Sequence, residues 1–186
     1  MRRAFFSPPD FTFDRKVEIG NGAFGKVYLG ALTDTKTTIC VKVSTNASDN
    51  TFEKEFELLA KMLGKEGIIQ THGFYDGGSF RYIVLEKADG TLEHLLNVPR
   101  HSLGLPMQLS LDLIGDLGNA LTVLSELKIA HRDIKPDNIL FFPNEKQKED
   151  NFRNIFKLCD FGMGRSVRKM DATFHTAGGT IPYMCN

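Results

Sequence analysis

The chain has 186 residues, of which 41% are hydrophobic and 25% are charged, and its 23 basic residues balance its 23 acidic ones. These values are typical of a globular protein with one sizeable core or two small ones. No stretch approaches about 18 consecutive apolar residues, and the first apolar run ends at Ser7-Pro8-Pro9, so we expect neither a membrane span nor a signal peptide.

The net charge of zero gives no electrostatic reason to expect nucleic acid or an anionic membrane as a partner. The three cysteines, Cys40, Cys159 and Cys185, form no CxxC pair and no even set. This usage is typical of a reducing compartment, and we therefore expect an intracellular protein, cytoplasmic or nuclear or both.

The N-terminal half has the pattern of β-strands. Residues 11–19 and 26–31 alternate in part between polar and apolar, and a β-branched run at 37–43 follows a polar turn at 33–36. This pattern predicts strands joined by hairpins.

An amphipathic helix is predicted next. Phe52, Phe56, Leu59 and Leu63 form one apolar stripe at helical spacing. Asn50, followed three residues later by Glu53, is a plausible capping box at its start.

The remaining pattern changes from strands to helices. It predicts short strands at 68–71 and 81–85, a polar turn at 86–90, a short helical piece at 91–96, a long helix at about 108–127, and two strands at 139–142 and 156–159 that flank a polar insertion at 143–156. The chain therefore divides into a β-rich part and a helical part.

Residues 19–27 contain a GxGxxG pattern, which alone is weak evidence for nucleotide binding. In a dinucleotide-binding fold this motif opens a helix, but a strand-like run follows it here, which argues against a dinucleotide oxidoreductase. Two interpretations stay open. The glycines form either a hairpin whose backbone N–H groups approach phosphates, with Val27 as an apolar lid for a base, or a plain tight hairpin.

Lys42 lies within an apolar, β-branched strand. Burial of a lysine is costly unless an anion meets it, although strand alternation also allows an exposed position. If Lys42 is buried, three glutamates on the next helix could pair with it, namely Glu53, Glu55 and Glu57. Glu55 falls nearest the apolar stripe and is our predicted partner.

A second polar cluster follows the long helix. Residues 131–138 (HRDIKPDN) place His, Arg, two Asp, Lys and Asn in eight positions, and Asp160-Phe161-Gly162 follows 22 residues beyond Asn138. Carboxylate and amide oxygens at two strand-edge loops are ligands that Mg²⁺ prefers, together with phosphate oxygens.

Taken together, these motifs resemble those of eukaryotic protein kinase domains. GxGxxGxV at 20–27, the lysine of ICVKV, HRDIKPDN at 131–138 and DFG at 160–162 occur in the family order, and the resemblance extends from about residue 13 to the last residue. It implies an α+β, bilobal kinase domain over 11–186 after an N-terminal extension, 1–10. That domain would have a β-rich N-lobe of about 11–85 with one helix, a hinge at 86–90, and an incomplete helical C-lobe at 91–186.

The resemblance also implies an ATP site. Lys42, held by Glu55, would contact the α- and β-phosphates, and backbone groups of Glu86 and Ala88 would meet the adenine behind Leu85. The ribose contact stays open between Asp89 and Thr91. The residues implied to cover the phosphates or to sandwich the base are Ile19, Gly20, Asn21, Gly22, Ala23, Phe24, Gly25, Lys26, Val27, Cys40 and Leu140.

The resemblance further implies a catalytic centre. Asp133 would accept or orient the proton of the substrate hydroxyl, Lys135 would neutralise charge on the γ-phosphate, and Asn138 and Asp160 would hold Mg²⁺. Lys135 and Thr180 resemble the serine/threonine class, so the implied reaction is transfer of the ATP γ-phosphate to Ser or Thr hydroxyls of a protein substrate.

Arg132 directly before Asp133 resembles kinases that are switched by a phosphate on the activation segment. An upstream kinase acting on Ser166, Thr173 or Thr176 would supply that phosphate. The alternative is a segment that is ordered without phosphate.

Several positions depart from the family pattern. Cys40 stands where alanine is usual, Thr71 stands where an apolar residue is usual and needs a hydrogen-bond partner if buried, and Cys159 is either a reactive thiol or a small buried residue. The sequence ends before the family's Ala-Pro-Glu segment, so we expect a truncated domain that exposes the apolar underside of the 108–127 helix. A catalytically silent fragment that binds nucleotide or a partner as a regulator is therefore the alternative function.

Overall fold

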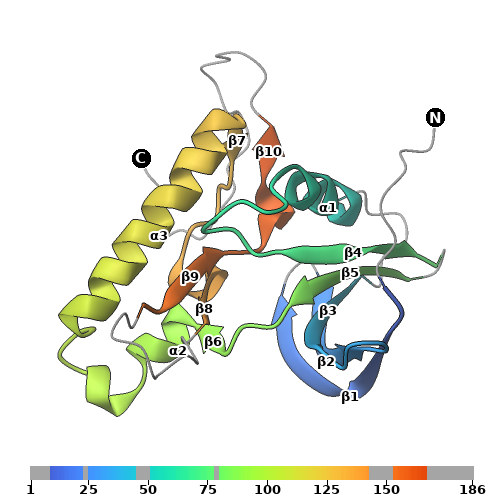
Figure 1. Ribbon diagram of the computed structural model, residues 1–186, viewed down its shortest axis with the longest axis horizontal. Coiled ribbons are helices and arrows are strands. Elements are labelled where there is room, and N and C mark those ends of the chain that lie inside the picture. Colours follow the sequence, from blue (N-terminus) through green and yellow to red (C-terminus); the bar gives the residue numbers. More distant parts are fainter. Residues whose placement is uncertain (1–8, 23–24, 45–50, 78–79, 143–152, 167–186) are drawn as a thin grey trace. The chain divides into compact units, whose positions relative to one another are not determined.

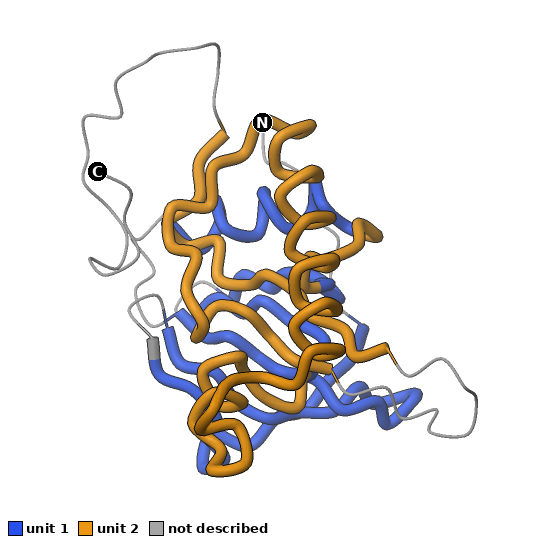
Figure 2. Tube along the Cα trace, turned by 90° about the vertical axis from the view of Figure 1, so that its left-hand side faces the viewer, with its two compact units in different colours: residues 1–63, 70–87 blue, residues 64–69, 88–186 orange. Residues whose placement is uncertain are grey.

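The computed structural model describes residues 9–22, 25–44, 51–77, 80–142 and 153–166. The chain divides into two compact units (Figure 2). The first comprises residues 1–63 and 70–87, and the second comprises residues 64–69 and 88–186. Residues 64–69 thus belong to the second unit, whereas the sequence-based division placed them with residues 11–85.

The first unit is built on a five-stranded antiparallel sheet with the strand order β1-β2-β3-β5-β4 (Figure 1). The elements of this unit are β1 (Phe11–Gly22), β2 (Gly25–Leu32), β3 (Thr38–Ser44), α1 (Thr51–Lys61), β4 (Thr71–Asp76) and β5 (Arg81–Glu86). The predicted hairpins at 11–43 are confirmed.

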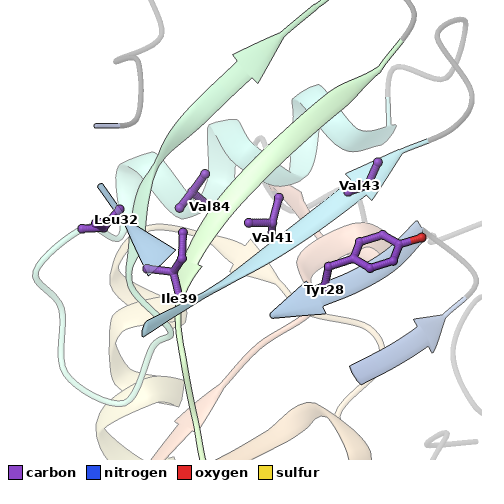
Figure 3. Packing of buried hydrophobic residues seen from close by; sticks show 6 residues of the cluster. All are labelled: Tyr28, Leu32, Ile39, Val41, Val43 and Val84. Carbon is purple, nitrogen blue, oxygen red and sulfur yellow. The ribbon is translucent and has the colours of Figure 1, made fainter. Parts of the chain in front are cut away.

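One face of this sheet carries an apolar core. Because side chains alternate along a strand, Ile39, Val41 and Val43 of β3 point to the same face. They pack with side chains from the neighbouring strands in a cluster of Tyr28, Leu32, Ile39, Val41, Val43 and Val84 (Figure 3). Phe11, Phe13 and Tyr82 pack against this cluster.

Helix α1 buries most of the predicted stripe. Phe52, Phe56 and Leu59 are buried, and the Phe56 ring stacks on that of Phe74 in β4 with 5.1 Å between centroids. The prediction for Leu63 is wrong, because the helix ends at Lys61 and Met62 is the buried residue in the following turn. Asn50, the proposed cap, lies outside the described residues.

In its described residues, the second unit contains two α-helices and two small sheets. Its helices and strands are β6 (Gly90–Thr91), α2 (Leu92–Leu96), α3 (Met107–Glu126), β7 (Ile129–Ala130), β8 (Ile139–Phe142), β9 (Ile155–Leu158) and β10 (Arg165–Ser166), with 3₁₀ turns at Pro99–His101, Pro136–Asn138 and Phe161–Met163. The strands pair as β6-β8-β9 and as β10-β7, and α3 runs beside β9 (Figure 1).

The predicted long helix and the strands at 139–142 and near 156–159 are confirmed, whereas the strand at 68–71 is wrong. Ile68 makes only an isolated parallel bridge with Leu158 of β9, and the strand begins at Thr71. The apolar run therefore reflects burial next to β9 rather than a place in the five-stranded sheet. Among the described residues no helix is both long and apolar enough to cross a membrane.

Candidate active site

In the first unit, Lys42 and Glu55 form a buried ion pair. The Lys42 Nζ donates to Glu55 Oε1 at 2.7 Å and to Oε2 at 2.8 Å, and the two side chains are only 8% and 2% exposed. The predicted contact is confirmed. Removing one partner of such a pair typically costs about 3–5 kcal/mol, because a charge then stays buried without its counter-ion.

The register of the sheet explains which face Lys42 occupies. Val27 lies opposite Lys42 on β2, and Leu85 lies opposite Cys40 on β5. Paired residues point to the same side of a sheet, as do residues two apart in one strand. Lys42, Cys40, Val27 and Leu85 therefore share the face opposite to the apolar core cluster.

Cys40 is half-buried on that face. Burial raises the pKa of its thiol to about 11, although Lys87 acts in the opposite direction. Since the thiolate is the reactive form, the thiol is inert at neutral pH.

The glycine motif forms the hairpin between β1 and β2, with Gly22 opposite Gly25. Gly25 has a φ of 137°, and a Cβ atom there would lie 2.5 Å from the carbonyl oxygen of Val43, so only glycine fits. Lys26 forms a surface pair with Glu18 at 2.8 Å. Ala23 and Phe24 lie outside the described residues.

Thr71, at the unexpected polar position, has its hydroxyl satisfied. The hydroxyl donates to the carbonyl oxygen of Val84 at 2.9 Å and accepts from the N–H of Gly73 at 3.2 Å. The pairing of β4 with β5 shifts register between Thr71 and Gly73. The side chain therefore serves as an internal cap for a β-bulge.

Glu86, at the end of β5, is tied to the segment before β4. The Glu86 N–H donates to the Gln70 carbonyl at 3.1 Å, and the Gln70 N–H donates to Glu86 Oε1 at 2.7 Å. This double contact fixes the chain just before Ala88, the other residue assigned to the adenine.

In the second unit, the loop at 131–138 brings together three of the predicted residues. Asp133 Oδ2 accepts a hydrogen bond from Asn138 Nδ2 at 2.9 Å and pairs with Lys135 Nζ at 3.0 Å. The 3₁₀ turn at Pro136–Asn138 folds Asn138 back onto the loop. The hydrogen bond to Asp133 raises the pKa of Lys135 further above its ordinary alkaline value.

His131 connects this loop to the DFG segment. Its Nε2 lies 2.8 Å from the carbonyl oxygen of Cys159, and its Nδ1 accepts from the N–H of Asp133 at 3.2 Å, which assigns the proton to Nε2. The ring meets Phe161 edge to face at 4.7 Å. Burial lowers the pKa of His131, so the ring is neutral at pH 7.

Asp160 is the residue after Cys159 in the chain. The Cys159 N–H donates to the Asn138 carbonyl at 2.9 Å, so the backbone joins the two predicted metal ligands. Asn138 uses its amide nitrogen on Asp133, which leaves the amide oxygen as the atom suited to a cation. An amide oxygen and a carboxylate are ligands that Mg²⁺ takes together with phosphates and water. Within the described part of the chain, no group of three or more His, Cys, Asp or Glu side chains is arranged to hold a metal.

The remaining predicted positions are only partly described. Ser166 is exposed in β10, whereas Thr173, Thr176 and Thr180 lie outside the described residues. Arg132 has a left-handed backbone with a φ of 73°.

Sequence reasoning missed two buried carboxylates on α3, Asp112 and Asp116, which accept backbone N–H groups next to β9. The only sequence signal is their i, i+4 spacing within an otherwise apolar helix face.

The family model of the protein kinase domain matches residues 13–186. The chain is 32% identical over 166 residues to the inhibitor of nuclear factor kappa-B kinase epsilon subunit homolog 1 of Caenorhabditis elegans. The aligned region covers 84% of this chain and 20% of that protein. It is 30% identical over 188 residues to mouse (Mus musculus) Aurora kinase C, and the aligned region covers 98% of this chain and 62% of that protein.

A further relative is the serine/threonine-protein kinase chk-1 of Caenorhabditis briggsae, at 29% identity over 175 residues that cover 89% of this chain and 33% of that protein. The chain thus spans less than two thirds of the length of each of these three relatives.

Proposed function

Because the chain belongs to the protein kinase domain family, we propose that it transfers the γ-phosphate of ATP to serine or threonine hydroxyls of a protein substrate. The acceptor oxygen attacks the γ-phosphorus, the bond from that phosphorus to the bridging oxygen breaks, and ADP leaves. The hydroxyl proton passes to Asp133. Such chemistry depends on positioning and on charge stabilisation rather than on covalent participation of the protein.

The observation that carries this proposal is the arrangement around Asp133. Asn138 and Lys135 both bind Oδ2, so the carboxylate is held in one orientation by an amide and a cation. A base must be fixed within hydrogen-bond reach of the proton that it accepts. Lys135, besides orienting Asp133, supplies positive charge for the transferred phosphoryl group.

The ion pair in the first unit supports binding of the nucleotide. Glu55 holds Lys42 on the sheet face that also carries Val27, Cys40 and Leu85. A fixed ammonium suits the α- and β-phosphates, and the apolar side chains beside it suit the adenine ring.

The metal would be held by the amide oxygen of Asn138 and the carboxylate of Asp160. Mg²⁺ bound there would neutralise charge on the phosphate oxygens. Preference for serine and threonine is supported by Lys135, two residues after Asp133, and by relatives that are named serine/threonine-protein kinases.

The test compares the chain with Asp133→Asn in transfer of labelled γ-phosphate from ATP to a mixture of Ser-, Thr- and Tyr-containing peptides. We expect Asp133→Asn to lower the rate by about 10²–10⁴-fold, because the proton acceptor is lost. Asp137→Asn makes the same charge change at an exposed position of the same loop and is expected to retain activity.

Equal rates for the chain and Asp133→Asn, or label found on tyrosine alone, would contradict the proposal. If ATP and Mg²⁺ raise the unfolding temperature without any transfer, the silent, nucleotide-binding alternative is correct instead.

A further inference from the structure

Strand β9 has one edge that no strand covers within the described residues. The register with β8 pairs Leu140 with Lys157 and Phe142 with Ile155. Backbone N–H groups alternate between the two edges of a strand. The N–H groups of Asn154, Phe156 and Leu158 all find acceptors other than β8.

Two of these acceptors are carboxylates from α3. Asp112 Oδ2 accepts from the Asn154 N–H at 3.0 Å, and Asp116 Oδ2 accepts from the Phe156 N–H at 2.8 Å. Both carboxylates are buried, with exposed fractions of 5% and 6%. Their spacing of four residues places them one above the other on the helix, and it matches N–H groups that are two residues apart in a strand.

The other oxygen of each carboxylate is also engaged. Asp112 Oδ1 accepts from Gln108 Nε2 at 3.0 Å, and Asp116 Oδ1 pairs with the guanidinium of Arg153. Both side chains are thereby held in one rotamer, which a fixed acceptor for a backbone group requires.

The third acceptor is the carbonyl of Gly67, which receives the Leu158 N–H at 2.8 Å. Gly67 itself lies against α3, where a Cβ atom would approach the Asp116 carbonyl oxygen to 2.5 Å. Asp112, Asp116 and Gly67 thus complete the free edge of β9 in the way a further strand would.

What this edge controls is the position of the DFG segment. Asp160 follows Leu158 by two residues, and the intervening Cys159 is bonded to Asn138 through its N–H and to His131 through its carbonyl. A shift of β9 along its axis would break both bonds and would move Asp160 relative to Asn138.

We propose that Asp116, assisted by Asp112, is a positioning residue that fixes the register of β9 and thereby places Asp160 beside Asn138. The anchoring itself does not depend on the chemistry of the protein, whereas its consequence for Mg²⁺ rests on the proposed function.

The first experiment measures hydrogen exchange of backbone amides in the full chain without nucleotide. Asp116→Ala leaves the Phe156 N–H without its acceptor, so exchange over 155–160 is expected to become about 10–100-fold faster, while exchange of β3 stays unchanged. Asp116→Asn keeps an acceptor oxygen and is expected to restore most of the protection. Glu126→Gln, an exposed acidic residue of the same helix, is the matched control.

Unchanged exchange over 155–160 in Asp116→Ala would overturn the proposal, and so would an equal increase in β3, which would indicate global destabilisation. If Asp116→Ala does not fold, Asp112→Ala tests the same edge at Asn154. Equal loss of protection in Asp116→Asn and Asp116→Ala would assign the effect to the ion pair with Arg153 and would also overturn the anchor.

The second experiment keeps ATP constant and titrates Mg²⁺. It measures the Mg²⁺ concentration at which the rise in unfolding temperature reaches half of its maximum. Asp116→Ala is expected to raise this concentration by about tenfold, as loss of an outer-shell support typically does, while Glu126→Gln leaves it unchanged. An unchanged Mg²⁺ midpoint in a variant with faster local exchange would overturn the link to Asp160. Absence of any ATP effect on the original chain would instead contradict the proposed function, and the exchange experiment would still decide the anchor.

Discussion

Two non-glycine residues in the site have a left-handed backbone. Arg132 has a φ of 73° and Asp160 a φ of 58°, a conformation that costs roughly 1–2 kcal/mol for each residue. Both lie beside groups that hold the loop together. The N–H of Asp133 donates to His131 Nδ1, and the carbonyl of Cys159 accepts from His131 Nε2. The two hydrogen bonds of neutral His131 therefore offset the backbone strain at Arg132 and at Asp160.

This role of His131 predicts a pH dependence of stability. Burial lowers the pKa of His131 in the folded chain, while in the unfolded chain it stays near 6.5. The unfolded state therefore binds the proton first, and the contribution of neutral His131 is fully present above about pH 6.5 and is lost as the pH falls towards the folded pKa.

We expect the free energy of unfolding to decrease between pH 7.5 and pH 5.5, and His131→Gln to flatten that decrease. Urea denaturation at several pH values measures it. His94→Gln, at an exposed position, is the control and should keep the original slope. A slope that is the same in His131→Gln as in the original chain would contradict the assignment.

At the scale of elements, the contact between Gly67 and α3 shows how a single residue sets the distance between two segments. Gly67 has a φ of 71°, and its missing Cβ leaves room for the backbone of Asp116 and Ala120. Gly64, three residues earlier, has a φ of 76° but nothing within 4 Å of its Cβ position. Substitution of either glycine would therefore cost the strain of a left-handed backbone, but only substitution of Gly67 would add a steric clash with α3.

We predict that Gly64→Ala lowers the free energy of unfolding by about 1–2 kcal/mol, the cost of a left-handed alanine. Gly67→Ala should cost about 2–5 kcal/mol, because overpacking against α3 adds to the same strain. Urea denaturation of both variants checks the difference. Equal costs would mean that the close approach to α3 contributes nothing.

At the scale of the whole molecule, the two faces of α3 differ in their surroundings. Leucine periodicity at 109, 113, 117, 121 and 124 predicts a broad buried face, and Leu109 and Leu124 are buried, whereas Leu121 is 49% exposed. The outward side chains Met107, Leu111 and Ile114 are 80%, 56% and 67% exposed. Their spacing of four and three residues places them in one apolar row, and such rows promote association.

We therefore predict that Leu111→Gln combined with Ile114→Gln reduces self-association, measured as the concentration dependence of light scattering. Leu96→Gln combined with Leu103→Gln removes two exposed leucines that lie off the helix, and this control should change the scattering little. An equal effect of both double variants would mean that general surface hydrophobicity, not the row on α3, drives association.

The local pattern of the sequence determined most elements and motifs. Alternation and helical periodicity predicted β1 to β3 and α3, and the spacing of the glycine, HRD and DFG motifs was sufficient to identify the family. These features are set by neighbours along the chain, so a sequence displays them directly.

Only the tertiary structure decided which face of β3 is buried with Glu55, where β4 begins, and what Asp112 and Asp116 bind. Alternation along β3 allows Lys42 to lie on either face of the sheet. The buried residues Ile68 and Ile69 would fit a strand of the sheet as well as the isolated bridge that Ile68 forms. An aspartate on a helix does not reveal that the N–H of a strand about 40 residues later will be its partner, because such pairing depends on contacts that folding alone brings together.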